Sequence, residues 1–249
     1  MTIELNNYYR PVLPEAISWA QTTKGQKSVA QLIDRVCTFC NEIFRTLHLG
    51  ASSYATYLSG KFKPMLAIGT VPGAIKDLNE VLHPEAIPEK DQKRWKEKYW
   101  VTVADVIGSF AGVILLITPT AAAPLPLKLL QGVAGVAGLF SLTDRVSSIF
   151  VNLWRGNVWN AEKDGKYSEQ QIRDTLFCDS VSLVQNFADG INSVSALSSL
   201  TRNVPIVSKL TSATLALVST ICSISVALFE KQLPEEGKRI ESFSKTHIA

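Results

Sequence analysis

The feature that most constrains this chain is a stretch of 35 residues that contains one charged side chain. Residues 106–140 read VIGSFAGVILLITPTAAAPLPLKLLQGVAGVAGLF, and Lys128 is the single charge. Three prolines divide the stretch into two apolar lobes: Pro119, Pro124 and Pro126. Proline inside a helix removes a hydrogen bond and clashes with the preceding turn, so one regular helix is excluded. The stretch therefore predicts a helical hairpin, with lobes near residues 100–118 and 127–154.

The hairpin has two interpretations, a pair of membrane-crossing helices or the buried hairpin of a soluble helical protein. A span needs about 20 mostly apolar residues to cross about 30 Å of hydrocarbon. The first lobe reaches that length only by including Asp105 near its start, and the second carries Asp144 within it. The chain as a whole is 46% hydrophobic and 19% charged, so at most part of it is expected in lipid. The sequence favours the membrane hairpin and leaves the soluble one open.

Glycines recur in both lobes at helical spacing. They are Gly108 and Gly112 in the first lobe, and Gly132, Gly135 and Gly138 in the second. Glycine costs about 1 kcal/mol relative to alanine in an exposed helix interior, so several of them predict close approach of helix backbones. In lipid this is a helix-packing seam, and in a soluble core it is the same close packing.

The flanks of the hairpin suggest an orientation. Tyr99, Trp100 and Trp154 stand at its ends, where aromatic side chains mark a membrane interface. Five Lys or Arg residues precede it within residues 90–98, and the turn between the lobes holds only Lys128. By the positive-inside rule both termini would be cytosolic. The alternative is a soluble protein, cytoplasmic or secreted without a classical signal peptide.

The rest of the chain is also predicted to be helical. An amphipathic helix is expected over residues 28–49, with a capping box at Ser28 and Gln31 and a stop at Gly50. Residues 52–81 show a weaker pattern, interrupted by Pro64 and Pro72. A second capping box, Ser168 and Gln171, opens a helix with one apolar stripe: Phe177, Val181, Val184, Ala188, Ile191 and Val194. This helix and the one over residues 28–49 are expected to pack on the apolar segments or to mediate self-association.

Residues 210–229 form the last expected helix, twenty residues without charge. The predicted fold is all-α, a multi-helix bundle with a central apolar helical hairpin and a C-terminal apolar helix. The expected divisions are an irregular N-terminal segment (1–27), an amphipathic helical region (28–83), a charged linker and helix start (84–100), the apolar hairpin (101–155), a C-terminal helical pair (156–230) and a polar tail (231–249).

Motifs for catalysis and for metal binding are weak. The one classical motif, CTFC at Cys37 and Cys40, lies in the middle of a predicted helix and lacks a second ligand pair at zinc-finger spacing. His48 and His83 stand at no matching spacing. We therefore expect no enzyme, catalytic residue, metal or cofactor. A nucleic-acid partner is not expected either, since the basic segment over residues 90–98 also carries acidic residues.

The order of the helices resembles the peroxisomal membrane-elongation proteins. An amphipathic helix near the N-terminus, VAQLIDRVCTFCNEIFRTL, precedes long helices and a final apolar pair, SVSLVQNFADGINSVSAL and SKLTSATLALVSTICSISVALF. The first of these helices lacks the strongly basic face expected for membrane insertion. The hairpin over residues 101–154 is similar to that of chlamydial inclusion-membrane proteins, which are secreted, insert by two close apolar helices and present cytosolic domains to host partners.

Both resemblances imply a membrane-embedded, non-enzymatic protein that acts by lipid deformation or by binding partners. The expected function is that of a helical protein that shapes a membrane or presents helices to protein partners. The expected partners are a lipid bilayer and a protein, which includes a second copy of the chain. No small-molecule substrate is identified. The alternative is a soluble all-α adaptor or secreted effector with the apolar hairpin buried in its core.

Overall fold

The computed structural model describes nine parts of the chain: residues 12–49, 53–86, 89–117, 129–130, 132–139, 142–143, 146–147, 168–202 and 204–232. Every regular element in these parts is helical, which confirms the all-α prediction. The elements are α1 (Val12–Ala20), α2 (Thr23–Thr46), α3 (Ser53–Leu82), the short 3₁₀ helix η2 (Pro84–Ala86), α4 (Glu89–Ile117), α7 (Glu169–Arg202) and α8 (Lys209–Gln232). Residues 132–139 add two helical turns of the second lobe.

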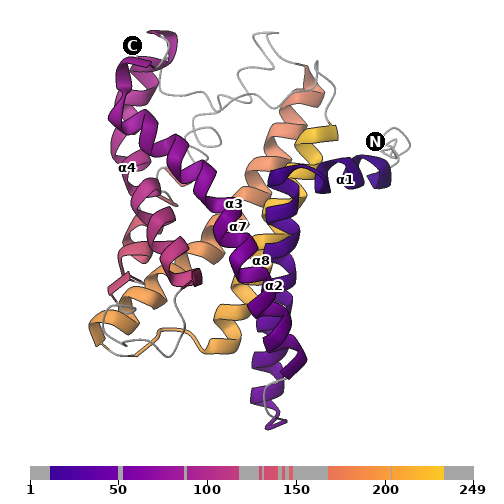
Figure 1. Ribbon diagram of the computed structural model, residues 1–249. Helices are drawn as coiled ribbons and strands as arrows, with labels where there is room; N and C mark the ends of the chain where they lie inside the picture. Colours follow the sequence, from indigo (N-terminus) through magenta and orange to yellow (C-terminus); the bar gives the residue numbers. More distant parts are fainter. Residues whose placement is uncertain are drawn as a thin grey trace.

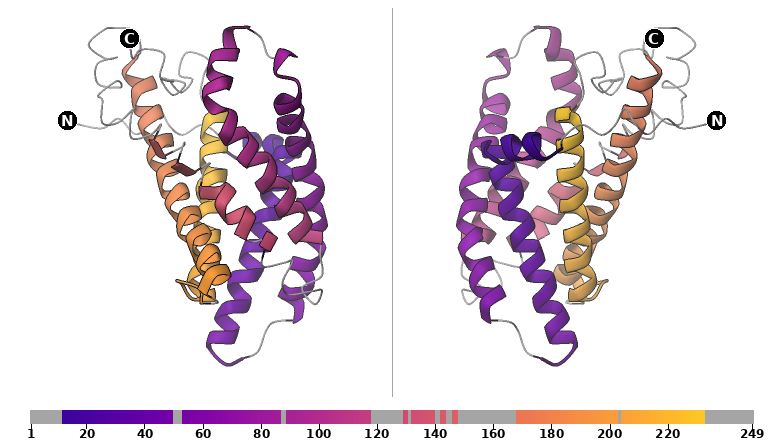
Figure 2. Two further views of the ribbon diagram at one scale, coloured as in Figure 1. Left: turned by 90° about the vertical axis from the view of Figure 1, so that its left-hand side faces the viewer. Right: turned by 90° about the vertical axis from the view of Figure 1, so that its right-hand side faces the viewer.

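The long helices form two groups (Figure 1). In the first group α2 packs on α3 and α3 packs on α4, and in the second group α7 packs on α8. Contacts between α2 and α8 join the groups, and α1 crosses one end of the bundle against both of these helices (Figure 2). The described residues of the second lobe lie between α4 and α7, as the glycine contacts below establish. Asp144 and half of this lobe lie outside the described residues.

One of the two expected capping boxes forms. At the start of α7 the backbone N–H of Ser168 donates to Gln171 Oε1 at 3.0 Å, and the N–H of Gln171 donates to Ser168 Oγ at 3.2 Å. The box expected at Ser28 is wrong, because α2 begins five residues earlier. There the Thr22 hydroxyl accepts from the N–H of Gly25 at 3.0 Å, and the Ser28 hydroxyl donates back to a carbonyl inside the helix.

Helix α2 ends before the expected glycine. His48 adopts a left-handed conformation with φ of 57°, and the N–H of Leu49 donates to the carbonyl of Phe44 at 2.8 Å. Together with the bond from His48 N–H to the Arg45 carbonyl, this is the Schellman pattern, in which a left-handed residue closes the helix. The stop predicted at Gly50 is therefore wrong, and His48 has a structural place at a helix end.

Two further differences concern proline. Helix α3 is continuous through Pro64 and Pro72, so the expected interruptions are wrong. This helix packs on α2 along one side and α4 along another, and tertiary packing holds the helix together despite the lost hydrogen bonds. Helix α1 occupies residues for which an irregular segment was expected. Its Pro14 lies in the first turn, where a backbone N–H has no partner within the helix.

The interior of the bundle is built from small and polar side chains. Nine of the fifteen buried apolar residues in the described parts are alanine, so backbones approach closely and large side chains contribute little to the core. Asp34 and Ser59 show how polar groups are accommodated: the Ser59 hydroxyl on α3 donates to the Asp34 carboxylate on α2, and both side chains are buried. The large apolar side chains lie mostly on the outside.

Candidate functional site

Helix α7 turns its apolar stripe outward. Five large side chains are exposed along it, and their spacings of seven, three, four and three residues place them on one face: Phe177, Val184, Phe187, Ile191 and Val194. Two polar side chains of α7 that are not part of the stripe face the interior. Asp174 is 2% exposed and Asn186 is 4% exposed, whereas Phe187 is 55% exposed. The sequence left packing and self-association open for this stripe. Ala188 is buried and Phe177 lies against Phe229 of α8, with ring centroids 4.7 Å apart, whereas Val184, Ile191 and Val194 are exposed.

The hairpin has the same arrangement. On α4 the exposed residues Trp100, Ile107, Phe110 and Ile114 follow helical spacing, and the buried residues Ala104 and Ala111 lie directly beside this face. On the second lobe Leu129, Val133 and Val136 are exposed. Between these two faces lies an apolar groove of about 540 Å³, with Trp100 and Ile107 on one wall and Val133 and Val136 on the other. The large side chains of the hairpin are therefore at the surface in the described residues.

Helix α8 is the one described helix that is long and apolar enough to cross a membrane, over Lys209–Lys231. The apolar part of α4 is shorter, over Tyr99–Ala111. Only a minority of the α8 segment is buried, so this helix is not enclosed as the central helix of a soluble protein usually is. The twenty uncharged residues predicted at this position are confirmed as helical.

The glycines of the hairpin lie at close approaches, although not all between the two lobes. A Cβ atom added to Gly108 on α4 would lie 3.0 Å from Ala137 Cβ, so the lobes touch there. At Gly135 and Gly138 the neighbour is α7: the added atoms would lie 3.2 Å from the Ser193 carbonyl oxygen and 2.9 Å from Ser193 Oγ.

For the other two predicted glycines, the structure gives only a position. Gly112 lies within α4, and Gly132 lines the apolar groove. The contacts of Gly108, Gly135 and Gly138 place the described residues of the second lobe between α4 and α7.

The three expected interface aromatics are only partly described. Tyr99 and Trp100 stand where the charged start of α4 gives way to its apolar part, with ring centroids 5.3 Å apart. Trp100 is 73% exposed, an arrangement that places a large amphipathic ring at the edge of the apolar surface. Trp154 lies outside the described residues.

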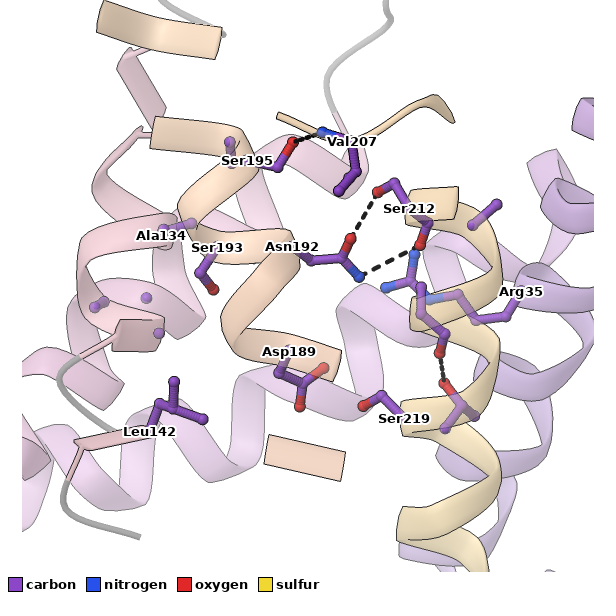
Figure 3. A pocket seen from close by; sticks show the side chains of 18 of the residues that line it. Arg35, Ala134, Leu142, Asp189, Asn192, Ser193, Ser195, Val207, Ser212 and Ser219 are labelled. Atoms are coloured by element: carbon purple, nitrogen blue, oxygen red, sulfur yellow. Dashed lines mark hydrogen bonds between the residues drawn. The ribbon is translucent and has the colours of Figure 1, made fainter. Parts of the chain in front are cut away.

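A polar cavity of about 1000 Å³, open to solvent, lies between α2, α3, α4, the second lobe, α7 and α8 (Figure 3). Its lining includes Arg35 from α2, Asp105 from α4, Asp189 and Asn192 from α7, and Ser212 from α8. Asn192 joins two of the walls: its amide donates to the Ser212 carbonyl at 3.3 Å, and the Ser212 hydroxyl donates to Asn192 Oδ1 at 2.8 Å. A polar interior and an apolar exterior therefore coexist in the same bundle.

The C-x-x-C pair lies in the middle of α2, as expected. Cys37 is buried, and burial raises the pKa of its thiol, with a further increase from the charge of Asp34 and from Cys40. A raised pKa keeps the thiol protonated, the opposite of what a redox-active cysteine requires. His83 contacts Glu85 at 3.1 Å in the η2 region. The described residues contain no group of three acidic, His or Cys residues that could hold a metal ion.

No family model matches the chain, and no curated protein and no solved structure matches it. Its function is therefore argued from its own residues.

Several residues of this site escaped the sequence reasoning. Gly190 is one: an added Cβ would meet Leu142 Cδ2 at 2.6 Å, so the second lobe rests on α7 at this point. The signal was available as ADG in the middle of an otherwise regular helix, since an interior glycine usually has a packing reason. Arg35 and Asp189 are others. They lie 154 positions apart on different helices, and no spacing rule connects them.

Proposed function

We propose that this chain is a non-enzymatic, membrane-associated helical protein that uses its exposed apolar faces to engage a lipid bilayer. The observation that carries the proposal is the inverted distribution of side chains. Alanine, serine, asparagine and aspartate fill the interior of the described helices, and valine, isoleucine and phenylalanine cover their outer faces.

The physical argument concerns what holds helices together in each solvent. In water, burial of large apolar side chains provides most of the folding free energy, at about 25 cal/mol per Å². In lipid that force is absent between helices, and small residues and polar contacts take its place. Exposed apolar stripes on α4, α7 and the second lobe are costly in water and favourable in lipid. The contacts of Gly108 and Gly138 are those expected of helices that pack through small residues.

In the proposed arrangement the hairpin of residues 101–154 enters the bilayer, and α8 lies in the cytosolic leaflet without crossing to the far side. The charged start of α4 and both termini remain on the cytosolic side, in accordance with the positive-inside rule. A hairpin whose two ends emerge on the same side adds volume to the membrane and exposes only the short turn between its lobes on the far side. This arrangement suits a protein that shapes a membrane or presents the helices α2 and α3 to a protein partner.

A second candidate is a soluble adaptor or secreted effector. The charges along α7 favour it, since Arg173, Asp174, Asp179 and Asp189 do not suit a simple span. In that case a protein partner or a second copy would cover the exposed stripes.

The test is alkaline carbonate extraction of the full chain from a membrane fraction, with three single variants. Ile107→Lys and Val133→Lys place a charge on the exposed faces of the hairpin, at a cost of about 2.5–3.5 kcal/mol if those faces meet lipid. Leu82→Lys is the control, because Leu82 is even more exposed than Ile107 and Val133 but lies at the end of α3 beside the polar η2 segment.

The native chain and Leu82→Lys are expected to stay in the membrane pellet, and the two hairpin variants to be released in part. Protease added to the cytosolic side should then cut within residues 89–98 and in the C-terminal tail. Complete release of the native chain as a monodisperse species without detergent would rule out the membrane proposal and favour the soluble candidate.

A further inference from the structure

The polar cavity holds unpaired charges of both signs. Arg35 and Lys209 are its cations apart from any in the parts not described, and Asp105 and Asp189 are carboxylates without an ion pair in the described residues. A third carboxylate, Glu42, is already paired with Arg45 at 2.9 Å. The four remaining charges sum to zero; Lys209 and Asp189 are exposed to solvent, and Arg35 and Asp105 are half-buried.

Among these charged side chains, Arg35 is the one with a buried atom that lacks a hydrogen-bond partner in the described residues. Its Nε atom is buried and has no hydrogen-bond partner, and no hydrogen bond or ion pair is found for the rest of its guanidinium among the described residues. Figure 3 shows this side chain reaching from α2 toward Asn192 and Ser212. Asn192 and Ser212 bond to each other, and neither accepts a hydrogen bond from Arg35 in the described residues. An arginine half-buried in this way is left to bind a group that enters the cavity.

The Arg35 guanidinium determines which chemical group one end of such a ligand must carry. Its planar set of donors matches the two oxygens of a carboxylate or the oxygens of a phosphate. Asp189, one helical turn before Asn192 on α7, lies in the same cavity and defines the other end, a positively charged group (Figure 3).

The lining also distinguishes between kinds of cation. Quaternary ammonium groups are recognised by cages of aromatic rings. The described lining of this cavity contains no Phe, Tyr or Trp and is instead rich in hydroxyl and amide groups. Such groups accept hydrogen bonds from a primary ammonium, which a quaternary ammonium cannot donate.

We propose that this cavity binds a small zwitterion that carries an oxyanion and a primary ammonium group, with the oxyanion on Arg35 and the ammonium on Asp189. Two sources share this chemistry, a free polar amino acid and the ethanolamine phosphate headgroup of a lipid. A volume of about 1000 Å³ accommodates either. The site does not depend on whether the bundle lies in a membrane, so its test stands apart from the carbonate experiment.

The test is isothermal titration calorimetry on the full chain in an uncharged detergent. The probes are serine, asparagine, glutamine and O-phosphoethanolamine, with phosphocholine as the quaternary control. At least one probe is expected to bind with a Kd below about 1 mM, and phosphocholine is expected to bind at least about tenfold more weakly. Binding of O-phosphoethanolamine alone assigns the headgroup, and binding of an amino acid alone assigns the free solute. Absence of binding by all four probes would overturn the proposal, as would equal binding of phosphocholine.

Three variants assign the contacts. Arg35→Gln and Asp189→Asn should each weaken binding by about 10- to 100-fold. Arg35→Lys keeps the positive charge but lacks the planar set of donors of a guanidinium, so this variant should bind the ligand more weakly than the native chain. It replaces Arg35→Gln as the test if Arg35→Gln does not fold. Arg173→Gln is the control: Arg173 pairs with Glu169 and lies sixteen residues, roughly 24 Å, along α7 from Asp189. Native affinity in both Arg35 variants, with helicity by circular dichroism unchanged, would remove Arg35 from the site and overturn the assignment.

Discussion

At the scale of single residues, close helix packing in this protein depends on positions where any side chain would collide with a neighbour. Gly25 is the most severe case. It lies at the corner between α1 and α2, where an added Cβ would be 2.0 Å from the carbonyl oxygen of Trp19. Backbone atoms hold that space, so no side-chain rearrangement can relieve the collision. The Thr22 hydroxyl, which accepts from the Gly25 N–H and donates to the Trp19 carbonyl, fixes the same corner.

Replacement of Gly25 by alanine is therefore expected to lower the free energy of unfolding by more than about 2 kcal/mol, since α1 must separate from α2. Gly60→Ala is the matched control. Gly60 lies inside α3 with nothing within 4 Å of an added Cβ, so alanine there should stabilise the helix by up to about 1 kcal/mol. Thermal unfolding followed by circular dichroism measures both. Equal unfolding temperatures for the two variants would show that the carbonyl of Trp19 does not lie against Gly25.

The thiol of Cys37 gives a prediction that depends on pH. Burial, and secondly the charge of Asp34, raise its pKa, so less thiolate is present at a given pH than for an ordinary cysteine. A pKa that is raised in the folded state stabilises the protein below the unfolded pKa, and this contribution is lost as the pH rises toward the folded value. Alkylation by iodoacetamide at pH 8 should be slower at Cys37 than at Cys40, and the difference should vanish in denaturant. Faster alkylation of Cys37 would indicate an activated thiol and reopen a redox role for the pair.

Residue-level signals in the sequence were informative where the chemistry is local. The capping box at Ser168 and Gln171 forms as predicted, because both partners lie within one turn. The end of α2 could not be predicted in the same way. His48 takes the left-handed conformation that glycine usually takes, and no local pattern distinguishes His48 from Gly50 as the residue that ends the helix.

At the scale of helices, the two S-x-x-Q motifs of this chain provide a paired experiment. Ser168→Ala removes the hydroxyl that accepts from the Gln171 N–H and should cost about 1 kcal/mol of stability. Ser28→Ala removes a hydroxyl inside α2, which caps nothing, and should change stability by less than about 0.5 kcal/mol. Denaturant unfolding of the two variants and of Thr22→Ala, the true cap of α2, measures the difference. A larger loss at Ser28 than at Ser168 would contradict these helix starts.

Periodicity predicted the helices well and said less about which side of each helix is buried. The stripe from Phe177 to Val194 indicates a helix whichever way it faces, and only the neighbours of α7 decide its orientation. Here those neighbours are glycine and leucine of the second lobe and serine of α8, which contact the small and polar side of α7. The prolines of α3 were misleading for a related reason. Their cost is local, and the packing that offsets it comes from α2 and α4.

At the scale of the whole molecule, the polar cavity could not be predicted, because its walls come from helices far apart in the sequence. Arg35, Asp105 and Asp189 belong to no sequence motif, and the sequence around each one predicts only a solvated charge. The division between a small, polar interior and a large, apolar exterior is also a property of the assembled bundle. It requires that the interior pack without help from the exterior side chains.

This division predicts that the outer faces can be made polar without loss of the fold. A variant with glutamine at five exposed positions should keep native helicity and become monodisperse without detergent: Ile107, Val133, Val184, Phe187 and Ile191. The control places glutamine at five buried alanines, where each added side chain should cost about 1–3 kcal/mol and together unfold the protein: Ala67, Ala104, Ala137, Ala188 and Ala213. Circular dichroism and size-exclusion chromatography compare both variants with the native chain. Loss of helicity in the outer variant would mean that these side chains pack against one another in the protein, and the inverted arrangement would then be wrong. A native chain that is already monodisperse without detergent would leave the packing intact and remove the need for lipid.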